Sequence, residues 1–169
     1  IIALRSRRRI AADPIPIGQN GDGWRPCLVG GVLAGAVLFV AVSLQQTGLV
    51  YTTAGKAAFI TGFYVPLVPV LGLLVGQRTG IATWIGAVLS IVGLYFLSVV
   101  ESTAINRGDV LEMVGAFVWA IHVLLIGRLA PRTDPLKLGF VQFMTVAIAS
   151  LVGALPAEQI TTEGLRAAM

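Results

Sequence analysis

The stretch KAAFITGFYVPLVPVLGLLVG, from Lys56 to Gly76, decides how this chain folds. It is almost entirely apolar, yet Pro66 and Pro69 lie within the run. In water a proline costs a helix interior roughly 3 kcal/mol or more, whereas helices in lipid tolerate proline where a neighbouring helix or a hydroxyl group satisfies the freed carbonyl. The stretch therefore predicts a kinked transmembrane helix in a bundle, with Thr61 and Tyr64, three residues apart, facing the bundle interior.

The composition of the whole chain agrees with a membrane protein. Of its 169 residues 56% are hydrophobic and only 12% are charged, and the mean hydropathy is +0.88. A soluble domain of this size could not cover so much apolar surface. The net charge of +4 comes from basic residues near the ends of apolar runs, which favours membrane topology over a nucleic-acid partner. The single cysteine, Cys27, excludes an internal disulfide and is expected to be a small packing residue.

Four other apolar runs flank the proline-containing one, and each is long enough to cross a hydrocarbon core of about 30 Å. The predicted spans are 27–44, 56–76, 81–100, 109–126 and 138–155. Residues 1–10 are expected to be the end of a truncated helix, 11–26 and 101–108 loops, and 156–169 a polar tail. The sequence thus predicts an all-α polytopic bundle that is a fragment of a larger one.

Two kinds of pattern predict contacts within the bundle. Gly31 and Gly35, like Gly72 and Gly76, stand four residues apart, a small-xxx-small spacing that favours close helix packing over a gating role. Asp109 and Glu112, three residues apart at the start of a span, resemble a capping box. We favour a structural role for Glu112, and a proton-coupling role stays open.

The basic residues predict an orientation. Alternating loops place nine of the twelve Lys and Arg residues on one side of the membrane: Arg5, Arg7, Arg8, Arg9, Arg25, Arg78, Arg128, Arg132 and Lys137. Lys56, Arg107 and Arg166 fall on the other side. By the positive-inside rule the first group is cytoplasmic, so the loop at 11–26 is cytoplasmic too.

Three segments resemble the EamA-type branch of the drug/metabolite transporter superfamily. They are QQTGLVYTTAGKAAFITGFYVPLVPVLGLLVGQRTG, TWIGAVLSIVGLYFLS and GDVLEMVGAFVWAIHVLLIGRLAPRTDPLKLGFVQF. The resemblance covers roughly residues 25–155 and implies ten transmembrane helices in two five-helix repeats of inverted topology. On that fold, 27–100 would be the last three helices of the first repeat, and 109–155 the first two helices of the second.

The resemblance implies a transporter of a small organic metabolite or drug, working by alternating access in the bacterial inner (plasma) membrane. Its partners would be the solute and the lipid bilayer, with no nucleic acid and no cofactor, and a homodimer is left open. The sequence gives no sign of an enzyme, since HExxH and Walker A motifs are absent and there is one histidine. An intramembrane enzyme therefore ranks last.

Polar and aromatic groups within the spans are the candidate substrate contacts, because such groups are expensive in lipid and tend to face a cavity. The substrate-binding candidates are Thr61, Tyr64, Glu112, Trp119, His122 and Gln142. Glu112, Trp119 and His122 share one helix face at i, i+7 and i+10. For His122 a hydrogen-bonded structural imidazole is the stronger alternative, and for Trp119 packing is at least as strong. The alternative for the whole chain is a non-transporting membrane anchor, an assembly partner or an inactive fragment.

Overall fold

The computed structural model describes residues 24–77, 79–98 and 105–157, and all the regular structure in these ranges is helical. The helices are α1 (Trp24–Leu49), α2 (Ala54–Gly62), α3 (Tyr64–Leu74), α4 (Ile81–Ser98), α5 (Arg107–Leu129), the 3-10 turn η1 (Ala130–Arg132) and α6 (Pro135–Ala157). The predictions for residues 1–23, 99–104 and 158–169 lie outside the described residues. The prediction of an all-α helical bundle is confirmed.

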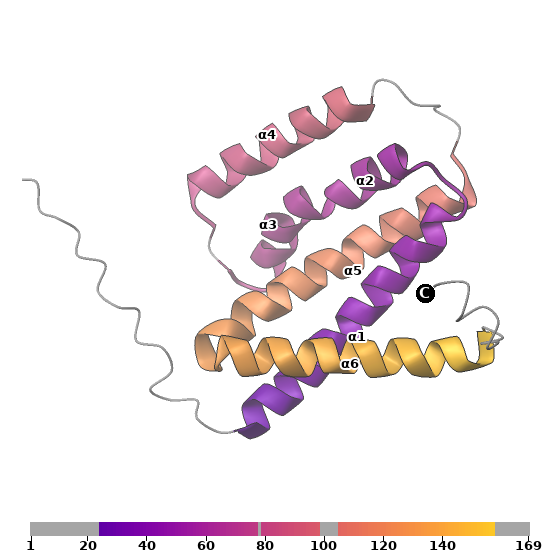
Figure 1. Ribbon diagram of the computed structural model, residues 1–169. Helices are drawn as coiled ribbons and strands as arrows, with labels where there is room; N and C mark the ends of the chain where they lie inside the picture. The colour runs from indigo at the N-terminus through magenta and orange to yellow at the C-terminus, as the bar shows by residue number, and fades with distance from the viewer. Residues whose placement is uncertain (1–23, 78, 99–104, 158–169) are drawn as a thin grey trace, which may run out of the picture.

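The helices pack in a row, as Figure 1 shows. The α4 helix lies against α2 and α3, these lie against α5, α5 lies against α1, and α1 is crossed on its other side by α6. The pair α1 and α5 is therefore the centre of the described molecule. The α1 helix contacts α2 and α6, and α5 contacts α2 and α3.

Within the described residues, four helical segments are long and apolar enough to cross a membrane: Trp24–Leu49, Ala54–Leu74, Arg107–Arg132 and Pro135–Leu155. The third predicted span, 81–100, corresponds to a shorter apolar stretch, Ile81–Phe96 in α4. Large apolar side chains such as Leu74, Ile81 and Phe96 point outwards, whereas the buried positions hold small residues such as Ala34 and Ala116. An apolar exterior around a core of small residues is what a bundle surrounded by lipid requires.

The predicted kink appears as a break between α2 and α3 at Phe63. Pro66 has no N–H to donate to the carbonyl of Gly62, four residues earlier, so the helical hydrogen-bond pattern is interrupted there. Leu67 resumes it by donating to the Phe63 carbonyl at 3.2 Å. Pro69 lies inside α3 without ending it.

Two predicted details are wrong. The first span does not end at Gln45, because glutamine is a good helix former and α1 runs on to Leu49. Gly76 is not a packing glycine either: it ends α3 with a φ of +76°, and a side chain there would meet nothing within 4 Å. Gln77 and Gly76 donate back to the carbonyls of Gly72 and Leu73, the bond pattern of a Schellman helix end.

The Gly31 and Gly35 pair is a packing surface, as predicted. A Cβ atom at Gly31 would lie 2.6 Å from the Val141 Cβ, and one at Gly35 would lie 2.6 Å from the Thr145 Cβ. Both neighbours belong to α6, so these glycines allow α6 to cross α1 almost in backbone contact. The crossing is visible in Figure 1.

Candidate functional site

The interface of α2 with the start of α5 carries a buried ion pair. The Lys56 ammonium lies 2.6 Å from the Asp109 carboxylate, and only 16% and 5% of the two side chains are exposed. The Thr52 hydroxyl donates a hydrogen bond of 2.8 Å to the same carboxylate. Asp109 thus joins the α1–α2 loop, α2 and α5.

Asp109 also corrects the predicted capping box. Its N–H donates to the side chain of Asn106, and its carboxylate accepts from the Asn106 N–H, so the box lies one turn earlier than the sequence suggested. The reason is that α5 begins at Arg107 rather than at Asp109, which makes Asp109 the third helical residue. Glu112 is therefore beyond the first turn and has a different environment.

Glu112 is completely buried one turn further along α5. Thr61 of α2 donates its hydroxyl hydrogen to Glu112 Oε2 at 2.6 Å. The other carboxyl oxygen, Oε1, has no hydrogen-bond partner among the described residues. The predicted pair Thr61 and Glu112 is thus brought together in the helix interface.

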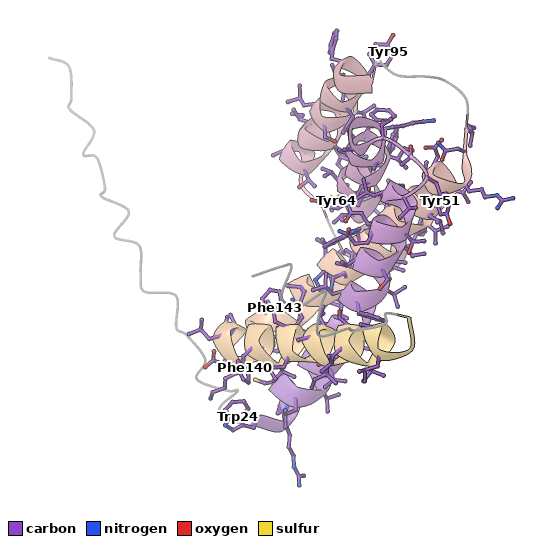
Figure 2. The ribbon with its side chains drawn as sticks, turned by 45° about the vertical axis from the view of Figure 1, so that its right-hand side comes forward. Trp24, Tyr51, Tyr64, Tyr95, Phe140 and Phe143 are labelled. Atoms are coloured by element: carbon purple, nitrogen blue, oxygen red, sulfur yellow. The ribbon has the colours of Figure 1, made fainter. Side chains whose placement is uncertain are left out.

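The aromatic candidates lie further down the same interface. The rings of Tyr64 and Trp119 are 6.3 Å apart between centroids, and Trp119 and His122 form an edge-to-face pair at 6.0 Å. The His122 imidazole lies against the backbone of Ala34 in α1. Neither Trp119 Nε1 nor His122 Nδ1 has a partner in the described part of the chain. The contact with Trp119 places Tyr64, which is labelled in Figure 2, on the side of α3 that faces α5.

Gln142 is placed apart from the other five candidates. It is buried on α6, whose main contacts are with α1, and its backbone carbonyl lies close to Gly35. Its side-chain oxygen has no hydrogen-bond partner among the residues described. The shared face predicted for α5 is therefore observed, whereas Gln142 belongs to the α1–α6 crossing.

Two cavities of about 400 Å³ each adjoin this set of helices. One lies beside the Lys56–Asp109 pair and is otherwise lined by apolar residues of α2 and α5, with Ile105. The other lies between α1, α3 and α5 at the end marked by Arg128, whose guanidinium donates to the Val75 carbonyl at 3.0 Å. None of the six predicted contacts lines either cavity.

Lys56 and Asp109 were not predicted as a site. Both were assigned to the ends of spans, where charge is common, although an ionisable residue within a span is itself a sign of function. What the sequence could not show is that α2 and α5 are neighbours, which places the two charges together. In the described ranges no group of three or more His, Cys, Asp or Glu residues could hold a metal ion.

Comparison with known proteins assigns the chain to a family. Residues 7–99 match the EamA-like transporter family. An uncharacterized transporter of Archaeoglobus fulgidus is 33% identical over 121 residues, which are 71% of this chain and 39% of the relative. No solved structure matches the chain.

The match spans more than half of the chain, so the chain belongs to the EamA-like transporter family. With its long apolar helices it is a multi-pass membrane protein. The chain spans 39% of the length of the archaeal relative.

Proposed function

We propose that the chain is part of a carrier that moves a small organic metabolite or drug across the plasma membrane by alternating access. The solute pathway runs along the interface of α2 and α3 with α5, and Thr61, Tyr64, Glu112, Trp119 and His122 contribute to it. The enzyme alternative has no support from the family or from the name of the relative.

The observation that carries this proposal is the gathering of five candidates from three helices at one interface. Thr61 bonds Glu112, and Tyr64 lies against Trp119, which lies against His122. Polar groups in a membrane-spanning interface have to be satisfied or to face water. Here Glu112, Trp119 and His122 each keep a buried polar atom that has no partner among the described residues. Atoms of this kind are available to a solute when the helices separate.

The same interface divides the chain where the two repeats would meet. In our assignment the last three helices of the first repeat are α1, the broken helix formed by α2 and α3, and α4. The first two helices of the second repeat are α5 and α6. The family match ends at residue 99, between α4 and α5, which supports this division. Carriers built from inverted repeats hold their solute between the repeats, near the middle of the membrane.

Orientation is a separate part of the proposal. We place the η1 loop in the cytoplasm and the α1–α2 loop outside, because of the nine-to-three distribution of basic residues. Single cysteines test it in the full-length protein with Cys27 replaced. Leu136→Cys should be protected from an impermeant thiol reagent in intact cells, whereas Val50→Cys should react; both positions are highly exposed. The reverse labelling would overturn the orientation.

A transport assay tests the function itself. The full-length protein is expressed in cells that lack related transporters and is challenged with a panel of amino acids, metabolites and drugs. At least one solute should be taken up or exported only in cells that express the protein. Trp119→Ala should reduce the rate of that transport about tenfold, while the amount of folded protein stays near normal. Phe143→Ala is the matched control, because that ring is exposed on α6 away from the interface (Figure 2). If no solute in the panel moves, the non-transporting membrane partner becomes the better account.

A further inference from the structure

Glu112 is the one carboxyl group in the described spans that is wholly buried without an ion-pair partner. Its exposed fraction is 0%. Its Oε2 accepts from the Thr61 hydroxyl at 2.6 Å, and its Oε1 accepts from no described group. An ionised carboxylate in such a place costs far more free energy than a neutral one, since one hydroxyl cannot replace its hydration.

The space around Glu112 is too small for a solute. The C-terminal end of α1 passes directly over the carboxyl, so that a Cβ atom added at Gly48 would lie 2.6 Å from Oε1 and 3.0 Å from Cδ. Even one carbon is excluded at this position without a shift of the helices. In this arrangement a proton is the ligand that fits Oε1.

The charged groups on the surrounding helices are engaged elsewhere. Lys56 of α2 is paired with Asp109 at 2.6 Å, and α3 has no charged residue. The charged residue of α1 is Arg25, at the opposite end of that helix from Gly48. On α5, Arg107 is exposed, Arg128 donates to Val75 at the far end, and His122 is ten residues or about 15 Å along the axis. Asp109, the closest acid in sequence, adds repulsion to an ionised Glu112.

We propose that Glu112 is the proton-binding group of this transporter and that Thr61 is its positioning residue. The inference rests on the proposed function and names the coupling ion for it. In the packed arrangement the carboxyl is neutral, with the proton on Oε1 and the Thr61 hydrogen bond on Oε2. When α2 separates from α5 and water enters, the O–H bond of the acid breaks, the proton passes to water, and the carboxylate keeps the electron pair. Rebinding a proton from the other side of the membrane restores the packed state.

Infrared spectroscopy of the full-length protein in lipid nanodiscs tests the protonation without needing a substrate. At pH 7 a carbonyl band of a protonated carboxyl group should be present, and it should disappear in Glu112→Gln. In Thr61→Val the same band should move to higher frequency, because its carbonyl oxygen loses a hydrogen bond. Thr52→Val is the matched control: that hydroxyl bonds Asp109 instead, so the band should not move. A spectrum in which the band is missing, or persists in Glu112→Gln, would overturn the proposal.

Transport tests the coupling once a substrate is known from the panel. Wild-type proteoliposomes should move the solute uphill when a pH gradient is imposed. In Glu112→Gln the ratio of this gradient-driven uptake to solute exchange at equal pH should fall at least tenfold. Phe143→Ala, exposed on α6, should keep the pH-gradient response. Loss of the response in His122→Gln with its retention in Glu112→Gln would assign coupling to the histidine and refute our assignment. If the protein transports no solute but shows the Glu112 infrared band, the proposed transport function is wrong while proton binding by Glu112 stands. Failure of the one proposal can therefore be told from failure of the other.

Discussion

The α1–α6 crossing and the α2–α5 contact are both close approaches of two helices, but they are built from different residues. At the first, Gly31 and Gly35 let α6 reach the backbone of α1, and the side chains that meet them are those of Val141 and Thr145. At the second, the contacts are Lys56 with Asp109 and Thr61 with Glu112. The α1–α6 crossing therefore depends mainly on a fit of shapes, whereas the α2–α5 contact is made by an ion pair and by the hydrogen bond to a buried carboxyl group.

This difference indicates that the α2–α5 contact is more able to open than the α1–α6 crossing. Separating α6 from α1 exposes the flat glycine surface, and among the described groups with unpaired buried atoms it would free only the Gln142 side-chain oxygen to gain a bond. Separating α2 from α5 allows water or a solute to satisfy the atoms that are now unpaired, so part of the cost is recovered. We accordingly regard α1 with α6 as scaffold and α2 and α3 with α5 as the moving interface.

The largest expected effect on stability is that of Asp109→Ala. The change removes the carboxylate that pairs with the buried Lys56 ammonium and also removes the capping box of α5, so the free energy of unfolding should fall by about 3–5 kcal/mol. Thermal unfolding in detergent measures it. Asp134→Ala is the control. Its pair with Lys137 is 3.8 Å long and about one-third exposed, and such pairs contribute about 0–1 kcal/mol, while loss of the cap that its side chain makes at the start of α6 costs about 1 kcal/mol more. Equal losses in the two variants would contradict the picture of an ionic α2–α5 contact.

A smaller loss is expected from Gly35→Ala. The new Cβ would lie 2.6 Å from the Thr145 Cβ and 2.7 Å from the Gln142 carbonyl oxygen, and crowding of this kind costs about 1–3 kcal/mol. The measurement is the fraction of monodisperse protein after extraction, together with its unfolding temperature. At Gly93 in α4 the same substitution meets nothing within 4 Å, so Gly93→Ala should be neutral or slightly stabilising. If Gly35→Ala is equally harmless, α6 does not cross α1 as described.

The smallest effect on stability is expected from Tyr64→Phe. The ring stays in place beside Trp119, and only a hydroxyl group on a partly exposed side chain is removed. The unfolding temperature should stay within about 1 °C of wild type, while the transport rate for the panel substrate falls several-fold. A parallel fall of both quantities would make Tyr64 a packing residue.

The sequence predicted the elements of this fold well because apolar length and proline placement act locally. The run from Lys56 to Gly76 is broken at Phe63, three residues before Pro66, as its prolines predicted. The spacing of Gly31 and Gly35 correctly predicted a close helix contact, which is the α1–α6 crossing. It also predicted correctly that Glu112, Trp119 and His122 share a face, since that depends only on helical periodicity.

Other features depend on which helices are neighbours, and no local pattern contains that information. Gln142 seemed equivalent to the other candidates until α6 was found against α1. Asp109 and Glu112 looked like one cap, yet one is an ion-pair partner of Lys56 and the other is bonded to Thr61. The start of α5 at Arg107, two residues earlier than predicted, decides between these roles.

Access of a small thiol reagent compares the two interfaces most directly. In full-length protein with Cys27 replaced by alanine, Tyr64→Cys should react from the water-filled pathway, and the substrate found in the panel should slow the reaction. Thr145→Cys, at the glycine crossing, should stay unreactive with or without substrate. Reaction at Thr145→Cys together with protection of Tyr64→Cys under all conditions would place the opening between α1 and α6 and contradict the account.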